Sequence, residues 1–272
     1  MDRKLLFLDL DGTLLNDNGI ITEGNRNALE AALAKGHGVV IDTGRPLSSA
    51  LGKAASLGLD KPGCYVIAFN GALIYDFGAQ SQVFRCSIPK DVVRKLFDQA
   101  KALNLHIQTY DATDVLAEPW YDPEIMAGYC CGMDIVYRIV DNICDALTDE
   151  PSKMLAIEEK DFTKLDRLQY FIETEMAEEL ECFHSNPRFL EIVKAGMNKG
   201  IAVKRLCDII GIDVANAVAA GDAANDLSMI RAAGIGVAMA NGTDEVKIHA
   251  DYVTERDNNH DGIAEIVEKF LL

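Results

Sequence analysis

Short apolar runs alternate with helix-patterned segments over the first third of the chain. The runs within Lys4–Leu10, Gly38–Arg45 and Cys64–Ala72 are continuous, which is typical of strands buried on both faces of a parallel sheet. In segments 22–36 and 46–59, apolar residues recur at the spacing of one helix face. Because strand and helix follow in turn, this region predicts a doubly wound α/β fold with a parallel, Rossmann-like sheet.

The last third of the chain repeats the same order. Segment 198–212 is amphipathic and is expected to end as a helix at Gly211, and segment 216–222 is a short apolar strand that ends in an acid. Further elements are expected as a short helix over 225–234, short strands at 234–239 and 250–254, and a helix over 261–272.

The middle of the chain has a different pattern. Its predicted strands often follow one another without a helix between them, which indicates an α+β sheet that is partly antiparallel. We therefore predict a discontinuous core domain over 1–81 and 193–272, and an inserted α+β cap domain over 82–192. The elements expected in the insert are helices over 89–104 and 161–176 and strands over 106–111, 133–140, 153–159, 180–185 and 189–195.

Composition and charge restrict the class of protein. The 272 residues are 49% hydrophobic and 25% charged, as in ordinary globular proteins. The formal net charge of −17 argues against general binding to nucleic acids or to anionic membranes, because both would be repelled. No apolar run approaches the roughly 18 residues that are needed to cross a bilayer.

The N-terminal segment and the cysteines indicate a cytoplasmic protein. The segment "MDRKLLFLDLDG" carries acids within its apolar run and has no small-residue cleavage site, so a signal peptide is not expected. The seven cysteines are scattered, odd in number and never spaced as C-x-x-C. This pattern favours reduced thiols over disulfides or a zinc site.

Several predicted strands end in polar or glycine-rich residues. In an open parallel sheet, ligands bind beyond the carboxyl ends of the strands. If the strands are parallel, one crevice gathers three or more carboxylates, which would repel one another without a cation. Oxygen ligands without nearby His or Cys favour Mg²⁺ and leave room for a substrate phosphate. The side chains expected there are those of Asp9, Asp11, Thr43, Asn70, Asp222, Asn225 and Asp226.

Each of these pieces also has a purely structural interpretation. The segment "DLDGT" alone could be a turn after a strand, and Asn225 could cap a helix. Arg45 and Lys199 could be ordinary exposed charges. Several such pieces at strand ends and in a consistent order favour a functional site.

The segments "DLDGT", "TGR", Lys199-Gly200 and "GDAAND" resemble the four signature motifs of the haloacid dehalogenase-like hydrolase superfamily. The insertion after "FNGA" resembles the type-two cap of its Cof-like phosphatases. The resemblance extends over nearly the whole chain and includes "FLEIVKAGMNKGIAVKRLCDIIGI" and "AVAAGDAANDLSMIRAAGIGVAMANG". It implies a Mg²⁺-dependent phosphatase in which the cap selects the substrate.

The resemblance implies distinct roles for the two acids of "DLDGT". Asp9 would attack phosphorus and form an aspartyl-phosphate. Asp11 would protonate the leaving alcohol and then accept a proton from the hydrolytic water. The spacing suits both roles, because residues two apart on an extended strand face the same side.

The resemblance also assigns ligands. Mg²⁺ would be held by the Asp9 and Asp222 side chains and by the backbone carbonyl of Asp11. Asp226 would support the metal or the lysine from behind. The phosphate would be bound by Thr43, Gly44, Lys199 and Asn225.

Contacts to the rest of the substrate are harder to assign from sequence. Arg45 and Asn70 in the core are candidates. In the cap the candidates are Lys153, His184, Arg188, Trp120 and Tyr121, although a surface or packing role is the simpler explanation for each.

The sequence therefore predicts hydrolysis of a small phosphorylated metabolite, either a sugar phosphate or a phosphorylated cofactor such as pyridoxal phosphate or flavin mononucleotide. A phosphomutase that uses the same aspartyl-phosphate is the alternative within enzymes. A phosphate-responsive binding module without turnover is the alternative outside them. The charge of −17 does not exclude a phosphate substrate, because exposed charges are screened beyond roughly 8–10 Å.

Overall fold

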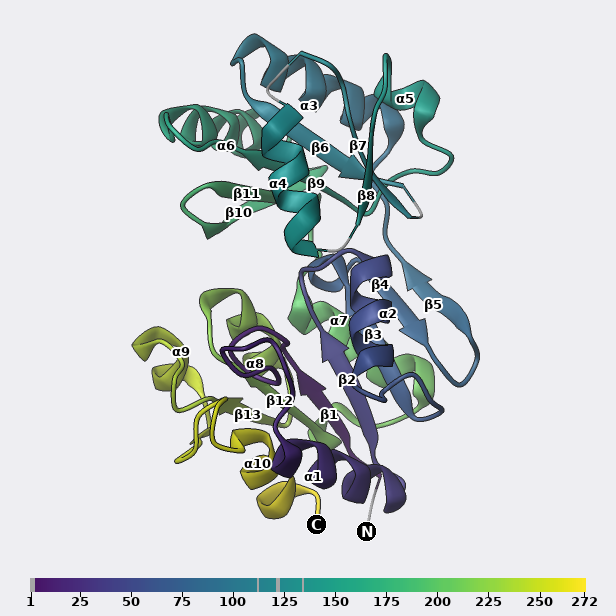
Figure 1. The fold of residues 1–272 in the computed structure, drawn as a ribbon, viewed down its shortest axis with the longest axis vertical. Helices are drawn as coiled ribbons and strands as arrows, with labels where there is room; N and C mark the ends of the chain where they lie inside the picture. Colours follow the sequence, from purple (N-terminus) through teal and green to yellow (C-terminus); the bar gives the residue numbers. More distant parts are fainter. Residues whose placement is uncertain (1–2, 112, 121–122, 134) are drawn as a thin grey trace. The chain divides into compact units, whose positions relative to one another are not determined.

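The computed structural model describes residues 3–111, 113–120, 123–133 and 135–272 (Figure 1). It divides into two compact units. The core unit comprises Met1–Gly44, Ala50–Phe84 and Asn198–Leu272, and the insert unit comprises Arg45–Ser49 and Arg85–Met197.

The core unit is built on an eight-stranded sheet with the order β14-β13-β12-β1-β2-β3-β4-β5. The strands from β14 to β3 pair in parallel, and β4 pairs antiparallel with β3. The strand order reverses between β1 and β12, so this edge is the topological switch point where ligands bind in such sheets. The strands are β1 Leu5–Leu8, β2 Gly38–Asp42, β3 Cys64–Ala68, β4 Leu73–Asp76, β5 Ser81–Arg85, β12 Ala217–Gly221, β13 Ile235–Ala238 and β14 Tyr252–Val253.

Helices cover both faces of this sheet (Figure 1). Leu5 and Phe7 of β1 pack with Val203 and Leu206 of α7 in one buried cluster, whereas α1 packs beside α10. Helix α7 ends because Gly211 adopts φ +70°, a conformation that glycine tolerates. The helices are α1 Glu23–Ala34, α2 Leu47–Ser56, α7 Lys199–Ile210, α8 Leu227–Ala232, α9 Asp244–His249 and α10 Gly262–Phe270, with 3₁₀ turns η1 Phe69–Gly71, η2 Val214–Asn216 and η3 Ala224–Asp226.

The insert unit has a six-stranded sheet with the order β10-β11-β9-β6-β7-β8. Its pairs are antiparallel except β7 with β8. Residues of α3 and α6 form a buried cluster with alternate residues of β6, β9 and β11. The elements are β6 His106–Tyr110, β7 Asp114–Ala117, β8 Val136–Ile139, β9 Lys153–Ile157, β10 Leu180–Asn186, β11 Phe189–Lys194, α3 Lys90–Ala102, α4 Pro123–Met133, α5 Ile143–Ala146 and α6 Thr163–Glu175.

The predicted fold class, a doubly wound parallel core with an inserted α+β unit, is confirmed. Among the predicted elements, one strand is displaced: the strand expected from Met133 begins only at Val136, and Met133 ends helix α4, which was not predicted. Helix α4 is apolar around most of its circumference, so its sequence carries no helical alternation to reveal it.

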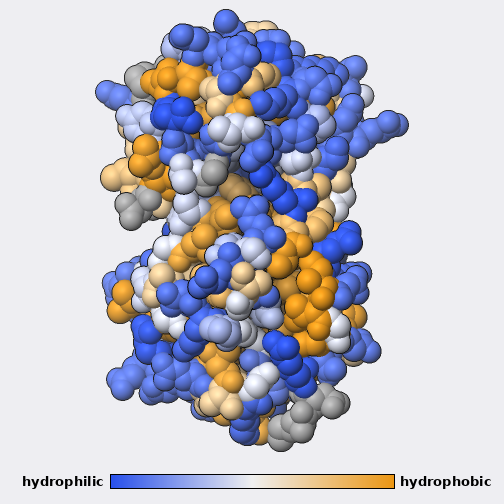
Figure 2. Space-filling view, turned by 90° about the vertical axis from the view of Figure 1, so that its right-hand side faces the viewer, coloured by the Kyte–Doolittle hydropathy of each residue, from blue (hydrophilic) through white to orange (hydrophobic). Residues whose placement is uncertain are grey.

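Polar residues cover most of the face drawn in Figure 2, with hydrophobic residues in separate patches. Among the described residues, no helix is both long and apolar enough to cross a membrane.

Candidate active site

Strands β1, β2 and β12 bring their carboxyl ends to one level of the core sheet. Leu8 pairs with Ile41 on one side and Ala220 on the other, and the Asp9 amide donates to the Ala220 carbonyl at 3.1 Å. Asp9 therefore follows β1 at the switch point, where Asp222 follows β12.

Lys199 lies at the centre of the acids, at the first residue of α7. Its ammonium donates to Asp9 Oδ1 at 2.6 Å and to Asp226 Oδ1 at 2.7 Å, and the side chain is fully buried. The Asn198 side chain accepts from the Ile201 amide and caps this helix. The interpretation of Lys199 as an exposed surface charge is therefore wrong.

Asp226 is engaged by the protein on both oxygens. Besides the contact with Lys199, its Oδ2 accepts the amide hydrogens of Asp222 at 3.0 Å and Ala223 at 3.1 Å. This fully buried carboxylate fixes both Lys199 and the start of the loop that carries Asp222.

Burial and charge shift the pKa values of this cluster. Burial raises the pKa of Asp9 to about 7, although the Lys199 ammonium lowers it. Burial and the Asp226 charge raise the pKa of Asp222 to about 6. Burial lowers the pKa of Lys199, but the charges of Asp226, Asp9 and Asp42 outweigh burial and raise it above its usual value.

The carboxylates of Asp9, Asp222 and Asp226 form a group that fits a divalent cation. One oxygen of each lies within 4.8 Å of the others, and Thr13 Oγ1 orients Asp222 by donating to its Oδ1 at 3.0 Å. An all-oxygen donor set beside other carboxylates is the chemistry that suits Mg²⁺. Because Asp226 is already occupied by Lys199 and two amides, Asp9 and Asp222 are the better ligands of the three.

Asp11 differs from Asp9 in its exposure. Its side chain is exposed, whereas that of Asp9 is buried, and its backbone bridges to Leu15 across the turn that contains Gly12. An exposed carboxyl can exchange protons with solvent, as acid–base chemistry requires.

Thr43, Gly44 and Asn70 lie together at the ends of β2 and β3. The Thr43 amide donates to Ile67 O, and its carbonyl accepts from the Asn70 amide at 3.2 Å. A Cβ on Gly44 would lie 2.8 Å from Asn70 Oδ1, so only glycine fits against this amide. Asn225 is partly exposed in η3 beside Asp226. Arg45 groups with the insert unit.

Asp42 is a member of this cluster that the sequence interpretation did not single out. It is fully buried, and neither carboxylate oxygen has a hydrogen-bond partner among the described residues. Burial, despite the nearby Lys199, raises its pKa well above the usual value. The available signal was an acid directly after an apolar run, as at Asp9.

The candidates in the insert unit have varied surroundings. Lys153 is buried, with its ammonium 2.5 Å from Glu191 Oε2. His184 is exposed on β10. The Trp120 indole donates to Glu118 Oε2 and packs against the insert core. Arg188 is exposed over the Phe189 ring, and Tyr121 lies outside the described residues.

The family model of the haloacid dehalogenase-like hydrolases matches residues 6–267. The 5-amino-6-(5-phospho-D-ribitylamino)uracil phosphatase YcsE of Bacillus subtilis is 33% identical over 273 residues, covering 100% of this chain and 97% of that protein. The pyridoxal phosphate phosphatase YbhA of Escherichia coli is 29% identical over 278 residues and is covered fully, as is this chain.

A solved structure agrees with these relatives. The crystal structure of a haloacid dehalogenase-like hydrolase from Bacteroides thetaiotaomicron matches with a TM-score of 0.89 at 32% identity, covering 98% of this chain and 99% of that chain. The predicted family and enzyme class, a phosphatase, are confirmed. The chain belongs to the haloacid dehalogenase-like hydrolases.

Proposed function

We propose that this chain is a Mg²⁺-dependent phosphatase that hydrolyses a small phosphomonoester through an aspartyl-phosphate on Asp9. The observation that supports this most is the contact of the buried Lys199 ammonium with both Asp9 and Asp226. A fixed cation beside Asp9 orients that carboxylate and stabilises negative charge that gathers on a transferring phosphoryl group.

In the first step, an Asp9 oxygen forms a bond to phosphorus while the bond from phosphorus to the ester oxygen breaks. Asp11 gives its proton to the departing alkoxide, which leaves as an alcohol. In the second step, Asp11 takes a proton from water as that water attacks phosphorus. The bond from phosphorus to Asp9 then breaks and inorganic phosphate is released.

Asp9, Asp222 and the Asp11 carbonyl would hold Mg²⁺, which neutralises charge on the phosphoryl oxygens when it is bound. Thr13 keeps Asp222 oriented for this role. Thr43 by its hydroxyl, Gly44 by its amide and Asn225 by its side chain would bind the remaining phosphate oxygens, together with Lys199.

The relatives and the residue chemistry support the proposed substrate class. The names of two relatives specify a ribitylaminouracil phosphate and pyridoxal phosphate, which are both small phosphomonoesters. We expect this chain to act on a molecule of the same size, either a phosphorylated cofactor or its precursor, or a sugar phosphate. The residues to vary for its selection are Asn70 in the core unit and Arg45, Lys153 and His184 in the insert unit.

The proposal is tested by phosphate release from a panel that contains these two esters, flavin mononucleotide and hexose phosphates. Turnover should require Mg²⁺ and stop when a chelator is added. Asp9→Asn should lower kcat at least about 10⁴-fold on every substrate, because it removes the nucleophile. The exposed Asp60→Asn has the same charge change and should retain the wild-type rate.

Other outcomes would point elsewhere. Transfer of phosphate between hydroxyls of a sugar without its release would identify a phosphomutase. A stable aspartyl-phosphate without turnover would favour the binding module. No release across the panel, or release that persists in Asp9→Asn, contradicts the proposal.

A further inference from the structure

The loop after β1 packs directly against Asp222. Gly12 adopts φ +83°, and a Cβ there would lie 2.6 Å from Asp222 Oδ2. Thr13 donates to the same carboxylate, and the Leu15 amide closes the turn onto the Leu10 carbonyl at 2.8 Å. The place of Asp11 therefore depends on how the Gly12 peptide is held.

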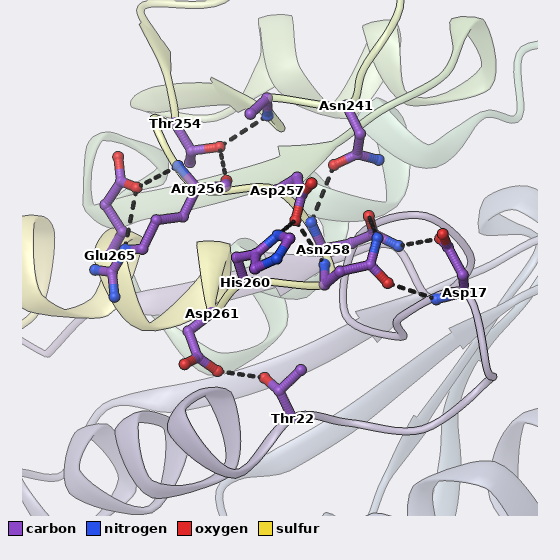
Figure 3. A network of polar contacts seen from close by, with 12 residues as sticks. Asp17, Thr22, Asn241, Thr254, Arg256, Asp257, Asn258, His260, Asp261 and Glu265 are labelled. Carbon is purple, nitrogen blue, oxygen red and sulfur yellow. Dashed lines mark hydrogen bonds and ion pairs between the residues drawn. The ribbon is translucent and has the colours of Figure 1, made fainter.

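The side chain of Asn241 holds that peptide. Asn241 Nδ2 donates to the Gly12 carbonyl at 2.7 Å. Its Oδ1 accepts from the Asn258 amide at 3.1 Å (Figure 3). The Gly12 carbonyl can only accept and the Asn258 amide can only donate. The side-chain amide of Asn241 supplies both a donor and an acceptor, and this orientation matches each of them to its partner.

Asn258 extends the contact along the same segment. Its Nδ2 donates to Asp17 Oδ1 at 3.1 Å (Figure 3) and to the Leu15 carbonyl at the same distance. The Asp17 amide donates to Asn259 Oδ1. Asn258 is only 2% exposed, so its bond to the Leu15 carbonyl is shielded from water. Asn241 and Asn258 together hold both ends of the segment 12–17.

The chain beside Asn241 also contacts the loop of Asp222. The Thr243 amide donates to the Asp222 carbonyl at 2.9 Å, and a Cβ on Gly242 would lie 3.2 Å from Asp222 Cα. The short segment 241–243 therefore touches both loops that carry acids of the site.

We propose that Asn241 is a positioning residue that acts through the Gly12 carbonyl to fix Asp11, with Asn258 as its support. This inference rests on the proposed function, in which Asp11 gives a proton to the leaving group. A displacement of about 1 Å in such a group costs on the order of 10²-fold in rate, so one hydrogen bond to its loop matters.

The catalytic effect can be separated from folding, because the Asn241 side chain is exposed. Water can replace its hydrogen bonds in a variant, so the cost in stability is small. Buried Asn258 is less suitable for substitution.

The experiment compares two substrates in Asn241→Ala and Asn241→Asp. The aspartate keeps the acceptor for Asn258 but loses the donor to Gly12. One substrate is the best alkyl phosphate of the panel, whose alkoxide needs a proton to leave. The other is p-nitrophenyl phosphate, whose phenolate leaves without one. The value of kcat/KM reports only the steps up to this departure.

For both variants, kcat/KM for the alkyl phosphate should fall by about 10- to 100-fold, and kcat/KM for p-nitrophenyl phosphate by less than about 3-fold. The amides of the segment that contains Gly12 should also exchange hydrogen faster than in the wild type. The control is Asn27→Asp at an exposed position of α1. It has the same charge change as Asn241→Asp and should show none of these effects.

The outcomes separate this inference from the proposed function. If the wild type hydrolyses neither substrate, the proposed function is overturned and the role of Asn241 with it. If the wild type is active but the variants lose both substrates equally, or lose neither, Asn241 does not act through Asp11. Unchanged hydrogen exchange would likewise contradict the positioning role.

Discussion

Two buried lysines, one in each unit, have carboxylate partners at similar distances but different surroundings. In the insert unit, Lys153 contacts Glu191 at 2.5 Å and lies 5.4 Å from the centre of the Tyr110 ring. One ammonium contacts one carboxylate, so the net charge of the pair is close to zero. Such a pair has no surplus charge that calls for a further ligand.

In the core unit, Lys199 is surrounded by more acids than it can balance. It contacts Asp9 and Asp226, and Asp42 contributes a further charge close enough to raise the lysine pKa. Asp222 completes the surplus. Burying several carboxylates against one ammonium is costly unless protons or a cation complete the balance. The excess of buried carboxylates therefore distinguishes the candidate site from a structural ion pair.

After loss of the nucleophile Asp9, removal of the central cation should give the largest effect. Lys199→Met is expected to lower kcat by about 10³-fold or more, because the charge aimed at the phosphoryl group is lost. Steady-state phosphate release measures this, with circular dichroism to confirm folding. Lys101→Met, an exposed lysine on α3, is the matched control. Turnover within tenfold of the wild type would show that Lys199 is only a structural partner of the acids.

Lys153→Met should act on stability instead. Because it leaves Glu191 buried and unpaired, it should cost about 3–5 kcal/mol of unfolding free energy in urea. The double variant Lys153→Met/Glu191→Leu should recover most of that loss. Its relative kcat/KM values across the substrate panel should match those of the wild type. A change in substrate preference would instead make Lys153 a substrate contact.

The contrast between the lysines also explains what sequence could predict. The acids of the core follow parallel strands, and parallel strands end at the same edge, so Asp9 and Asp222 were placed together from local patterns. The order of the four motifs along the chain indicated the family. The partner of Lys153 depends instead on the antiparallel register of β11 with β9, which pairs distant segments and leaves no local signal.

Asp42 and Asn241 were missed for different reasons. Asp42 ends an apolar run, and a polar strand end is common enough to need no explanation. Its lack of hydrogen-bond partners becomes visible only in three dimensions. Asn241 lies in a loop after β13, and its contact with Gly12 joins opposite ends of the chain. Neither the periodicity of apolar residues nor the spacing of motifs in the sequence predicts such a hydrogen bond.

The surplus of acids in the core predicts a pH-dependent response to Mg²⁺. Burial, more than any other cause, raises the pKa of Asp222 to about 6 and that of Asp9 to about 7. The folded, metal-free protein therefore retains protons that the unfolded chain releases above about pH 4. This contribution to stability is complete below about pH 4 and is lost as the pH rises through about 6 to 7.

Mg²⁺ must displace those protons, so its stabilising effect should grow over the same pH range. At 100 times its Kd near pH 8, Mg²⁺ should add about 2.7 kcal/mol, and clearly less at pH 5 at the same concentration. Thermal unfolding with and without Mg²⁺ measures this, and Asp222→Asn should remove most of the response. An equal shift of the unfolding temperature at both pH values would mean that these acids do not bind the ion.

Substitution of Asp42 should give the smallest effect and tests the charge surplus without touching Lys199. Burial raises the pKa of Asp42, so its contribution to stability is present below the usual aspartate pKa and is lost as the pH rises. The side-chain amide introduced by Asp42→Asn would mimic the protonated acid and cannot ionise. The unfolding temperature of this variant relative to the wild type should therefore increase from pH 4 to pH 8.

Exposed Asp91→Asn on α3 should show no such trend. A difference that stays constant with pH would show that Asp42 carries no unfavourable buried charge, and the surplus around Lys199 would be one carboxylate smaller.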